Sequence, residues 1–143
     1  MFTDEKSFTA WLKKQENTQF SKLSDHFNKE QKTELYKLYQ NCLTLDDYSL
    51  GLVMQKMGSA VAGLVQFVAL VETIDTGSKK KEFVLETIAN LYRLIDKGID
   101  GTEDNIDKET SDFSAYGVST EEDFQAMFLK MADQSIESFW SGW

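Results

Sequence analysis

The residues of this sequence best suited to bind a ligand are carboxylates that follow one another closely over residues 96–107. Read as a twelve-residue calcium-binding loop, this stretch has carboxylates at positions 1, 5, 9 and 12, which are Asp96, Asp100, Asp104 and Asp107. Gly101 supplies the turn glycine at position 6, and hard cations prefer such clustered oxygen ligands. The pattern departs from a regular loop at Gly98, which offers no side-chain oxygen at position 3, and at Glu103, where an apolar residue is usual. One interpretation of this stretch is therefore a Ca²⁺ or Mg²⁺ site in a cation-regulated helical protein.

The same carboxylates favour a second interpretation, in which they bind a protein. Residues 96–123 contain ten acidic residues and two lysines, a net charge of −8, whereas residues 1–95 are neutral overall. A concentrated negative potential attracts a basic surface, and salt weakens that attraction. Inhibitors and immunity-type proteins that cover the basic site of a nuclease work in this way. The carboxylates expected to contact such a partner are Asp100, Glu103, Asp104, Asp107, Glu109 and Asp112. The simplest alternative is a solvated loop that only keeps the protein soluble.

A second set of candidate contact residues lies at the C-terminal end of the sequence. Trp140 and Trp143 form an aromatic cluster with Phe139. Exposed tryptophans are typical anchors of protein interfaces, so we expect Trp140 and Trp143 to contribute to partner binding. The alternative is that this end of the chain folds back onto the helices.

No pattern of residues in the sequence identifies an enzyme or a cofactor. The chain has one histidine, His26, and one cysteine, Cys42, and it lacks a glycine-rich phosphate loop and a zinc-spaced Cys/His set. Cys42 lies on the apolar face of an expected helix, which favours a buried thiol over a nucleophile. The net charge of −9 and the single arginine, Arg93, argue against nucleic acid as the partner. We therefore expect a non-catalytic binding protein, with a basic protein as its partner and no cofactor.

The elements that must position these side chains are helices, and the central one is expected at about residues 46–75. Its apolar residues recur every three or four positions: Leu50, Met54, Met57, Val61, Leu64, Val68 and Val71. Thr44 and Asp47 resemble a capping box at its start. The uncharged run over residues 57–71 is shorter than the roughly 20 residues that span a membrane, so we expect the core helix of a bundle rather than a membrane partner. A membrane- or lipid-associated helical bundle is the alternative.

A different side of this helix carries small residues, which are Gly51, Gly58, Ala62 and Ala69. Small side chains allow another helix to come close, so homo-oligomerisation through this side is a further alternative.

The rest of the sequence predicts an all-α bundle of about six helices in a single domain covering residues 1–143. Further helices are expected from Thr3 to about residue 14, over about 18–27, from Asn28 to about 43, from Ser78 to about 97, and from Ser119 onwards. A long acidic loop is expected over about residues 99–118. The absence of proline favours helices, and the acidic, polar first residues favour a cytoplasmic protein.

Overall fold

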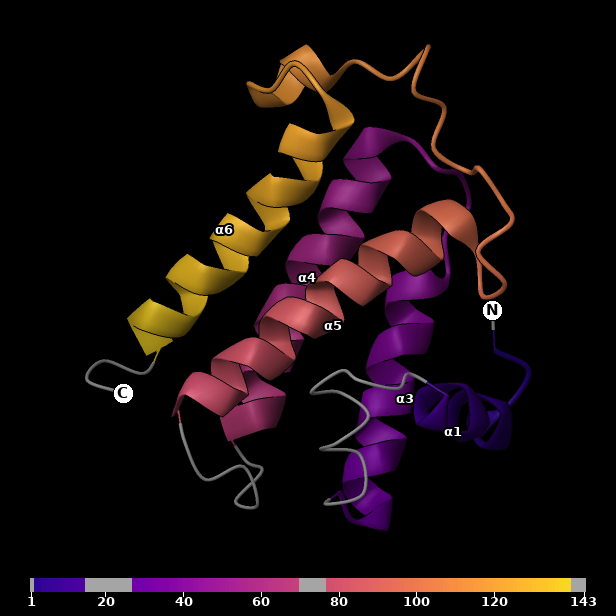
Figure 1. Ribbon diagram of the computed structural model, residues 1–143, viewed down its shortest axis with the longest axis vertical. Coiled ribbons are helices and arrows are strands. Elements are labelled where there is room, and N and C mark those ends of the chain that lie inside the picture. The colour runs from indigo at the N-terminus through magenta and orange to yellow at the C-terminus, as the bar shows by residue number, and fades with distance from the viewer. Residues whose placement is uncertain (1, 15–26, 70–76, 140–143) are drawn as a thin grey trace.

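The part of the chain that the computed structural model describes, residues 2–14, 27–69 and 77–139, is mainly α-helical (Figure 1). The α-helices are α1 (Glu5–Lys13), α3 (Lys29–Leu43), α4 (Leu50–Ala69), α5 (Gly77–Lys97) and α6 (Glu121–Phe139), and a short 3-10 helix, η1, covers Phe113–Tyr116. No strand occurs among the described residues, so the all-α prediction is confirmed. The helix expected at about 18–27 falls on residues outside this description apart from its last position, and the count of six is therefore not confirmed.

Helices α4 and α5 form the centre of the molecule. They pack against each other, with α3 on one side and α6 on the other, and α1 packs against α3 (Figure 1). The buried side chains of α4 recur at helical spacing: Leu50, Val53, Met57, Ala60, Val61, Leu64, Val65 and Val68. The apolar stripe expected from the sequence thus faces the core, except that Met54 is half-buried and position 71 is outside the described residues.

The central helix begins at Leu50 rather than near residue 46, so the expected start at Thr44 is wrong. Thr44 instead follows the end of α3, where its hydroxyl donates to the carbonyl of Gln40 at 2.6 Å. The Asp47 carboxylate accepts the N–H of Ser49 at 2.9 Å, which holds the turn in front of the helix. Asp47 and Thr44 therefore stabilise the connection between α3 and α4, and neither caps α4.

The starts of α1, α3 and α6 and the C-terminal end of α5 match the predictions to within a residue. The start of α5, at Gly77, lies two residues before the position expected after a cap at Ser78. Asn28 and Gln31 form the expected capping box of α3, with hydrogen bonds of 2.8 and 2.9 Å. Gly98 has a φ of 77°, the left-handed conformation expected after α5. The cap of α1 is Asp4 rather than Thr3. At α6, Thr120 rather than Ser119 accepts an N–H of the first turn.

These one-residue differences have a common physical reason. The expected caps Thr3 and Ser119 are each followed by a residue that also has a side-chain oxygen, Asp4 and Thr120. Either residue of each pair can accept the free N–H groups of the first helical turn. At α5 the helix already includes Gly77, so Ser78 lies inside it and is not the residue before it.

Helix α4 is long and apolar enough to cross a membrane by length and composition, with 44% of its most apolar window buried inside the protein. Its exposed residues are small or uncharged polar ones: Gly51, Gln55, Ser59, Ala62 and Gln66. A helix that buries its large apolar side chains and exposes small and polar ones fits the core of a helical bundle. The small-residue side is thus accessible, with Gly51 and Ala62 exposed and Gly58 and Ala69 half-buried, and self-association through it stays a prediction.

The two glycines in the middle of α4 provide a test of this packing. A Cβ at Gly58 would have no neighbouring atom within 4 Å, whereas a Cβ at Gly63 would lie 3.0 Å from Cδ1 of Leu38. Alanine is favoured over glycine in a helix by about 0.5–1 kcal/mol. We therefore expect Gly58→Ala to raise the free energy of unfolding by that amount, and Gly63→Ala to give a smaller gain or a loss. Urea denaturation of both variants checks this, and an equal gain at the two positions would contradict the α3–α4 packing.

Candidate functional site

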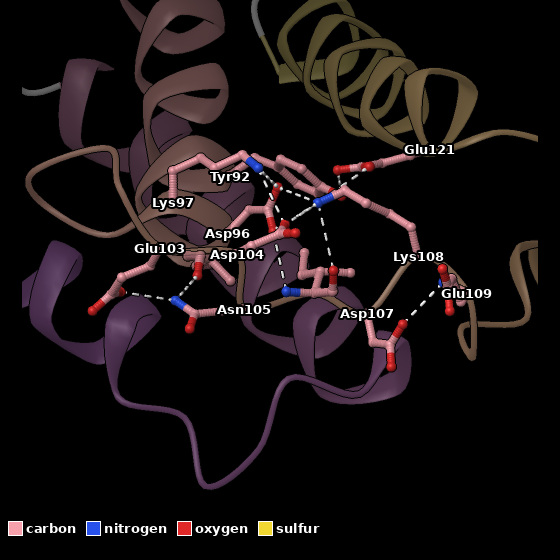
Figure 2. Close-up of polar contacts among 12 residues, drawn as sticks. Tyr92, Asp96, Lys97, Glu103, Asp104, Asn105, Asp107, Lys108, Glu109 and Glu121 are labelled. Atoms are coloured by element: carbon pink, nitrogen blue, oxygen red, sulfur yellow. Dashed lines mark hydrogen bonds and ion pairs between the residues drawn. The ribbon is translucent and has the colours of Figure 1, made fainter.

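We call the stretch between α5 and α6, residues 98–120, the acidic segment. It packs against Asp96, a buried acidic residue in the last turn of α5. The side chain of Asp96 is 5% exposed. Its carboxylate accepts the N–H of Ile106 at 3.1 Å and the ammonium of Lys108 at 3.0 Å, as Figure 2 shows. The backbone carbonyl of Asp96 accepts the N–H of Asn105 at 2.8 Å. A buried carboxylate is costly unless it is paired and hydrogen-bonded, and here both conditions are met.

Lys108 connects this carboxylate to two others. Its ammonium lies 2.6 Å from Asp104 and 3.5 Å from Glu121, so one lysine joins α5, the acidic segment and the first turn of α6 (Figure 2). Burial acts to lower the pKa of Lys108, but the hydrogen bonds that its ammonium donates to Asp104 and Asp96 outweigh this effect, and the pKa is raised above its ordinary value. We call Asp96, Lys97, Asp104, Lys108 and Glu121 the Lys108 cluster.

Two further contacts link the Lys108 cluster to its surroundings. Lys97 lies 3.1 Å from Asp104, which gives this exposed carboxylate a second cation. The Glu121 carboxylate also accepts the hydroxyl of Tyr92 at 3.3 Å. Burial and then the charge of Glu121 raise the pKa of Tyr92, so this hydroxyl stays protonated and remains a donor.

Apolar and backbone contacts fix the acidic segment further. Ile106 is fully buried and Phe113 nearly so, with the Phe113 ring 5.5 Å from that of Phe124 in α6. The side chain of Asn105 donates to the carbonyl of Ile95 at 3.0 Å. The expectation of a long loop over 99–118 is therefore not confirmed, because buried side chains and the 3-10 helix η1 interrupt the stretch. Figure 1 shows the segment running from beside the N-terminus, past the start of α4, to α6.

The four carboxylates predicted to bind a cation do not come together as one site. Asp96 and Asp104 hold Lys108, and the Asp107 carboxylate accepts the N–H groups of Glu109 and Thr110. Asp100 is exposed in the turn after α5. No group of three or more His, Cys, Asp or Glu side chains able to hold a metal ion occurs within the described residues. The prediction of a metal site therefore gains no support from this part of the chain.

The carboxylates predicted to bind a partner divide into two kinds. Four have a role within the protein: Glu103 accepts from Asn105, Asp112 accepts from Ser114, Asp104 pairs with the lysines, and Asp107 holds its turn. Asp100 and Glu109 are exposed, and no described side chain pairs with either. Trp140 and Trp143 lie outside the described residues.

A groove that the sequence did not predict lies beside the acidic segment. It has a volume of about 600 Å³ and lies between the α3–α4 connection and η1. Tyr48 and Tyr116 line it together with three carboxylates, which are Asp47, Asp107 and Asp112. A Cβ at Gly51 would lie 3.6 Å from the hydroxyl of Tyr116, so η1 closes one side of the groove against α4. In the sequence, a tyrosine lies close to acidic residues at 46–48 and again at 112–116. Only the fold brings these two stretches to the same groove.

Cys42 is confirmed as a buried residue. Burial raises the pKa of its thiol to about 12, and its sulfur lies 3.9 Å from that of Met57. A thiol with this pKa stays protonated at neutral pH and is a poor nucleophile. His26 lies outside the described residues.

Comparison with protein-family models, with curated proteins and with solved structures finds no match to this chain.

Removing the charge of Lys108 should destabilise the protein more than removing that of Lys97. In Lys108→Met the buried carboxylate of Asp96 loses its closest cation, and we expect a loss of about 1–3 kcal/mol in the free energy of unfolding. Lys97 is more exposed and lies 3.7 Å from Asp96, so Lys97→Met should cost less than about 1 kcal/mol. Equal midpoints for the two variants in chemical denaturation would contradict this assignment.

The Lys108 cluster should also make the anchoring of the segment depend on pH. Hydrogen bonds from Lys108 and Lys97 hold the pKa of Asp104 below the ordinary 3.8, so its stabilising contribution is present above that value and is lost as the pH falls through the lower folded value. The raised pKa of Lys108 acts in the opposite sense: its contribution is present below the ordinary 10.5 and is lost as the pH rises through the higher folded value.

We therefore expect the segment to be held most firmly between about pH 4 and pH 10. Amide hydrogen exchange at Ile106, corrected for intrinsic rates, checks this, because its N–H donates to Asp96. Protection should be greater in the native chain than in Asp104→Asn at neutral pH, and the difference should shrink as the pH falls below 3.8 and Asp104 becomes protonated. A difference independent of pH would rule out the charge of Asp104 as its cause.

Proposed function

We propose that this chain is a non-catalytic protein that binds stoichiometrically to a basic surface of a partner protein, as an inhibitor, an immunity-like factor or an adaptor. The segment 99–123 supplies the binding surface. The uneven charge of the chain supports this proposal, because residues 96–123 hold a net charge of −8 out of a total of −9. Such a concentration of charge accelerates encounter with a basic partner.

The observation that carries the proposal is the anchoring of this segment by Lys108. A charged surface that is already ordered loses less conformational entropy on binding than a flexible one. Asp96 is buried and Asp104 is neutralised by lysines, whereas Asp100 and Glu109 remain exposed on the same segment. The segment therefore presents carboxylates to solvent from a backbone that is held in place.

The proposal extends to the C-terminal aromatic residues. Trp140 and Trp143 would add apolar anchors to a surface that is otherwise acidic, since tryptophans are frequent among the residues that contribute most to binding energy. A cytoplasmic location belongs to the same proposal.

The test is a charge reversal at the two exposed and unpaired carboxylates. The double variant Asp100→Lys and Glu109→Lys changes the surface without touching the Lys108 cluster. The matched control is Glu30→Lys with Glu34→Lys, which makes the same change in net charge at exposed positions of α3. Each protein is immobilised, exposed to a lysate of the source cell at low salt, and eluted with a salt step, because the screening length falls from roughly 10 Å at 0.1 M to 3 Å at 1 M.

We expect the native chain and the α3 control to release the same basic protein at the salt step, identified by mass spectrometry. The variant at Asp100 and Glu109 should lose it, with a decrease in capture of at least about tenfold. Equal capture by the two double variants would remove the acidic segment from the binding surface.

A further inference from the structure

Three grooves follow one another along the acidic side of the molecule and share lining residues. The groove of about 600 Å³ between the α3–α4 connection and η1 includes Tyr48, and Tyr48 also lines a second groove of about 350 Å³. The second groove includes Ile99 and Asp100, and both also line a third groove of about 560 Å³, which α1 borders with Trp11. We call this sequence of depressions, from Tyr116 through Tyr48 and Ile99 to Trp11, the lateral groove.

Apolar and aromatic side chains line part of the lateral groove. Ile99 is 37% exposed, and it is one of only two large aliphatic or aromatic residues exposed among the described residues, the other being Leu129 in α6. Trp11, Tyr48 and Tyr116 are half-buried along the same groove. The Trp11 ring is held at 5.5 Å from that of Phe2, so its position is set by the core. Aromatic side chains are enriched at protein interfaces, and here two tyrosines and a tryptophan line the same groove as the exposed Ile99.

The lateral groove is also lined by exposed carboxylates. Five carboxylates line it, which are Asp47, Asp100, Glu103, Asp107 and Asp112, against one lysine, Lys14. This charge excludes a nucleic acid as the occupant and favours a cationic one. A small polyamine would satisfy the carboxylates but would leave Ile99 and Trp11 unused. A peptide segment that contains both cationic and apolar side chains uses both features.

We infer that the lateral groove binds one segment of the partner protein in which lysine or arginine residues alternate with apolar residues. This inference rests on the proposed function and adds the chemistry of the recognised segment. Side chains of an extended segment point alternately to opposite sides, so its apolar residues can contact Ile99 and the aromatic rings while its cationic residues contact the carboxylates. The volume of each of the three grooves lies in the range that is typical of ligand-binding pockets. Contact with Ile99 would then make the lateral groove prefer this segment over a basic surface that has no apolar side chains.

The experiment compares two synthetic peptides with the full chain. Both have about twelve residues, roughly 40 Å when extended, with lysine at alternate positions; one has leucine in between and the other has serine. Fluorescence anisotropy measures the affinity of each peptide for the native chain, for Ile99→Ser and for Leu129→Ser. Leu129→Ser is the matched control, because it removes the other exposed aliphatic residue and lies outside the lateral groove. Circular dichroism verifies that both variants keep their helices.

We expect the native chain to bind the leucine peptide at least about tenfold more tightly than the serine peptide, since burial of one aliphatic side chain is sufficient for such a difference. In Ile99→Ser this ratio should fall towards one, and in Leu129→Ser it should be unchanged.

The other outcomes separate this inference from the proposed function. Equal, salt-sensitive binding of both peptides would overturn the inference and leave the proposed function in place. A similar loss in Ile99→Ser and Leu129→Ser, or displacement of both peptides by spermine with equal ease, would also overturn it. Binding of neither peptide, together with equal capture by the charge-reversed variants of the preceding test, would overturn both proposals.

Discussion

The ion pair between Asp96 and Lys108 is the contact on which the acidic side of this molecule depends. Asp96 lies at the end of a core helix with its side chain 5% exposed, where an unpaired carboxylate would be strongly unfavourable. The ammonium of Lys108 pairs with this carboxylate at 3.0 Å, and the N–H of Ile106 donates a second hydrogen bond to it. The contact between Lys108 and Asp96 brings the chain back to the end of α5. It is consistent with the burial of Ile106 and with the start of α6 beside Lys108. A buried ion pair adds little net stability over apolar packing, but breaking one is costly, so it fixes one arrangement of the segment.

This arrangement separates the negative charge into an inner and an outer part. The inner carboxylates surround Lys108, and the outer ones face solvent and the lateral groove. The groove exists because the segment is fixed on one side by the Lys108 cluster and on the other by η1, whose residue Tyr116 lies beside the start of α4. A flexible loop of the same composition would have similar net charge but no fixed relation between Asp107, Tyr48 and Ile99. If this segment binds a partner as proposed, its order would lower the entropy cost of binding, in addition to the attraction that its charge supplies.

The sequence predicted those features that depend on neighbours along the chain. The apolar stripe of α4, the capping box at Asn28 and the left-handed Gly98 are local patterns, and the structure confirms each of them. The start of α4 was misplaced because Thr44 and Asp47 have two compatible roles, and only the packing of α3 against α4 selects between them. The role of Lys108 was missed for a different reason. A sum of charges counts it as one cation among ten acids, whereas its effect comes from a contact with Asp96 that the fold creates. Tyr48, Ile99 and Trp11 are likewise too far apart in sequence for any pattern to join them.

The same ion pair bears on the choice between a dissolved cation and a protein as the ligand. A metal ion bound by Asp96 and Asp104 would have to displace the ammonium of Lys108, which is attached to the same segment and is therefore present at a high effective concentration. The displaced lysine would then lie close to the metal and repel it. A partner protein meets neither obstacle, because Asp100 and Glu109 are exposed and no described side chain has to leave them. Binding at the outer carboxylates thus preserves the Asp96–Lys108 pair that orders the surface, whereas binding at the inner ones would break it.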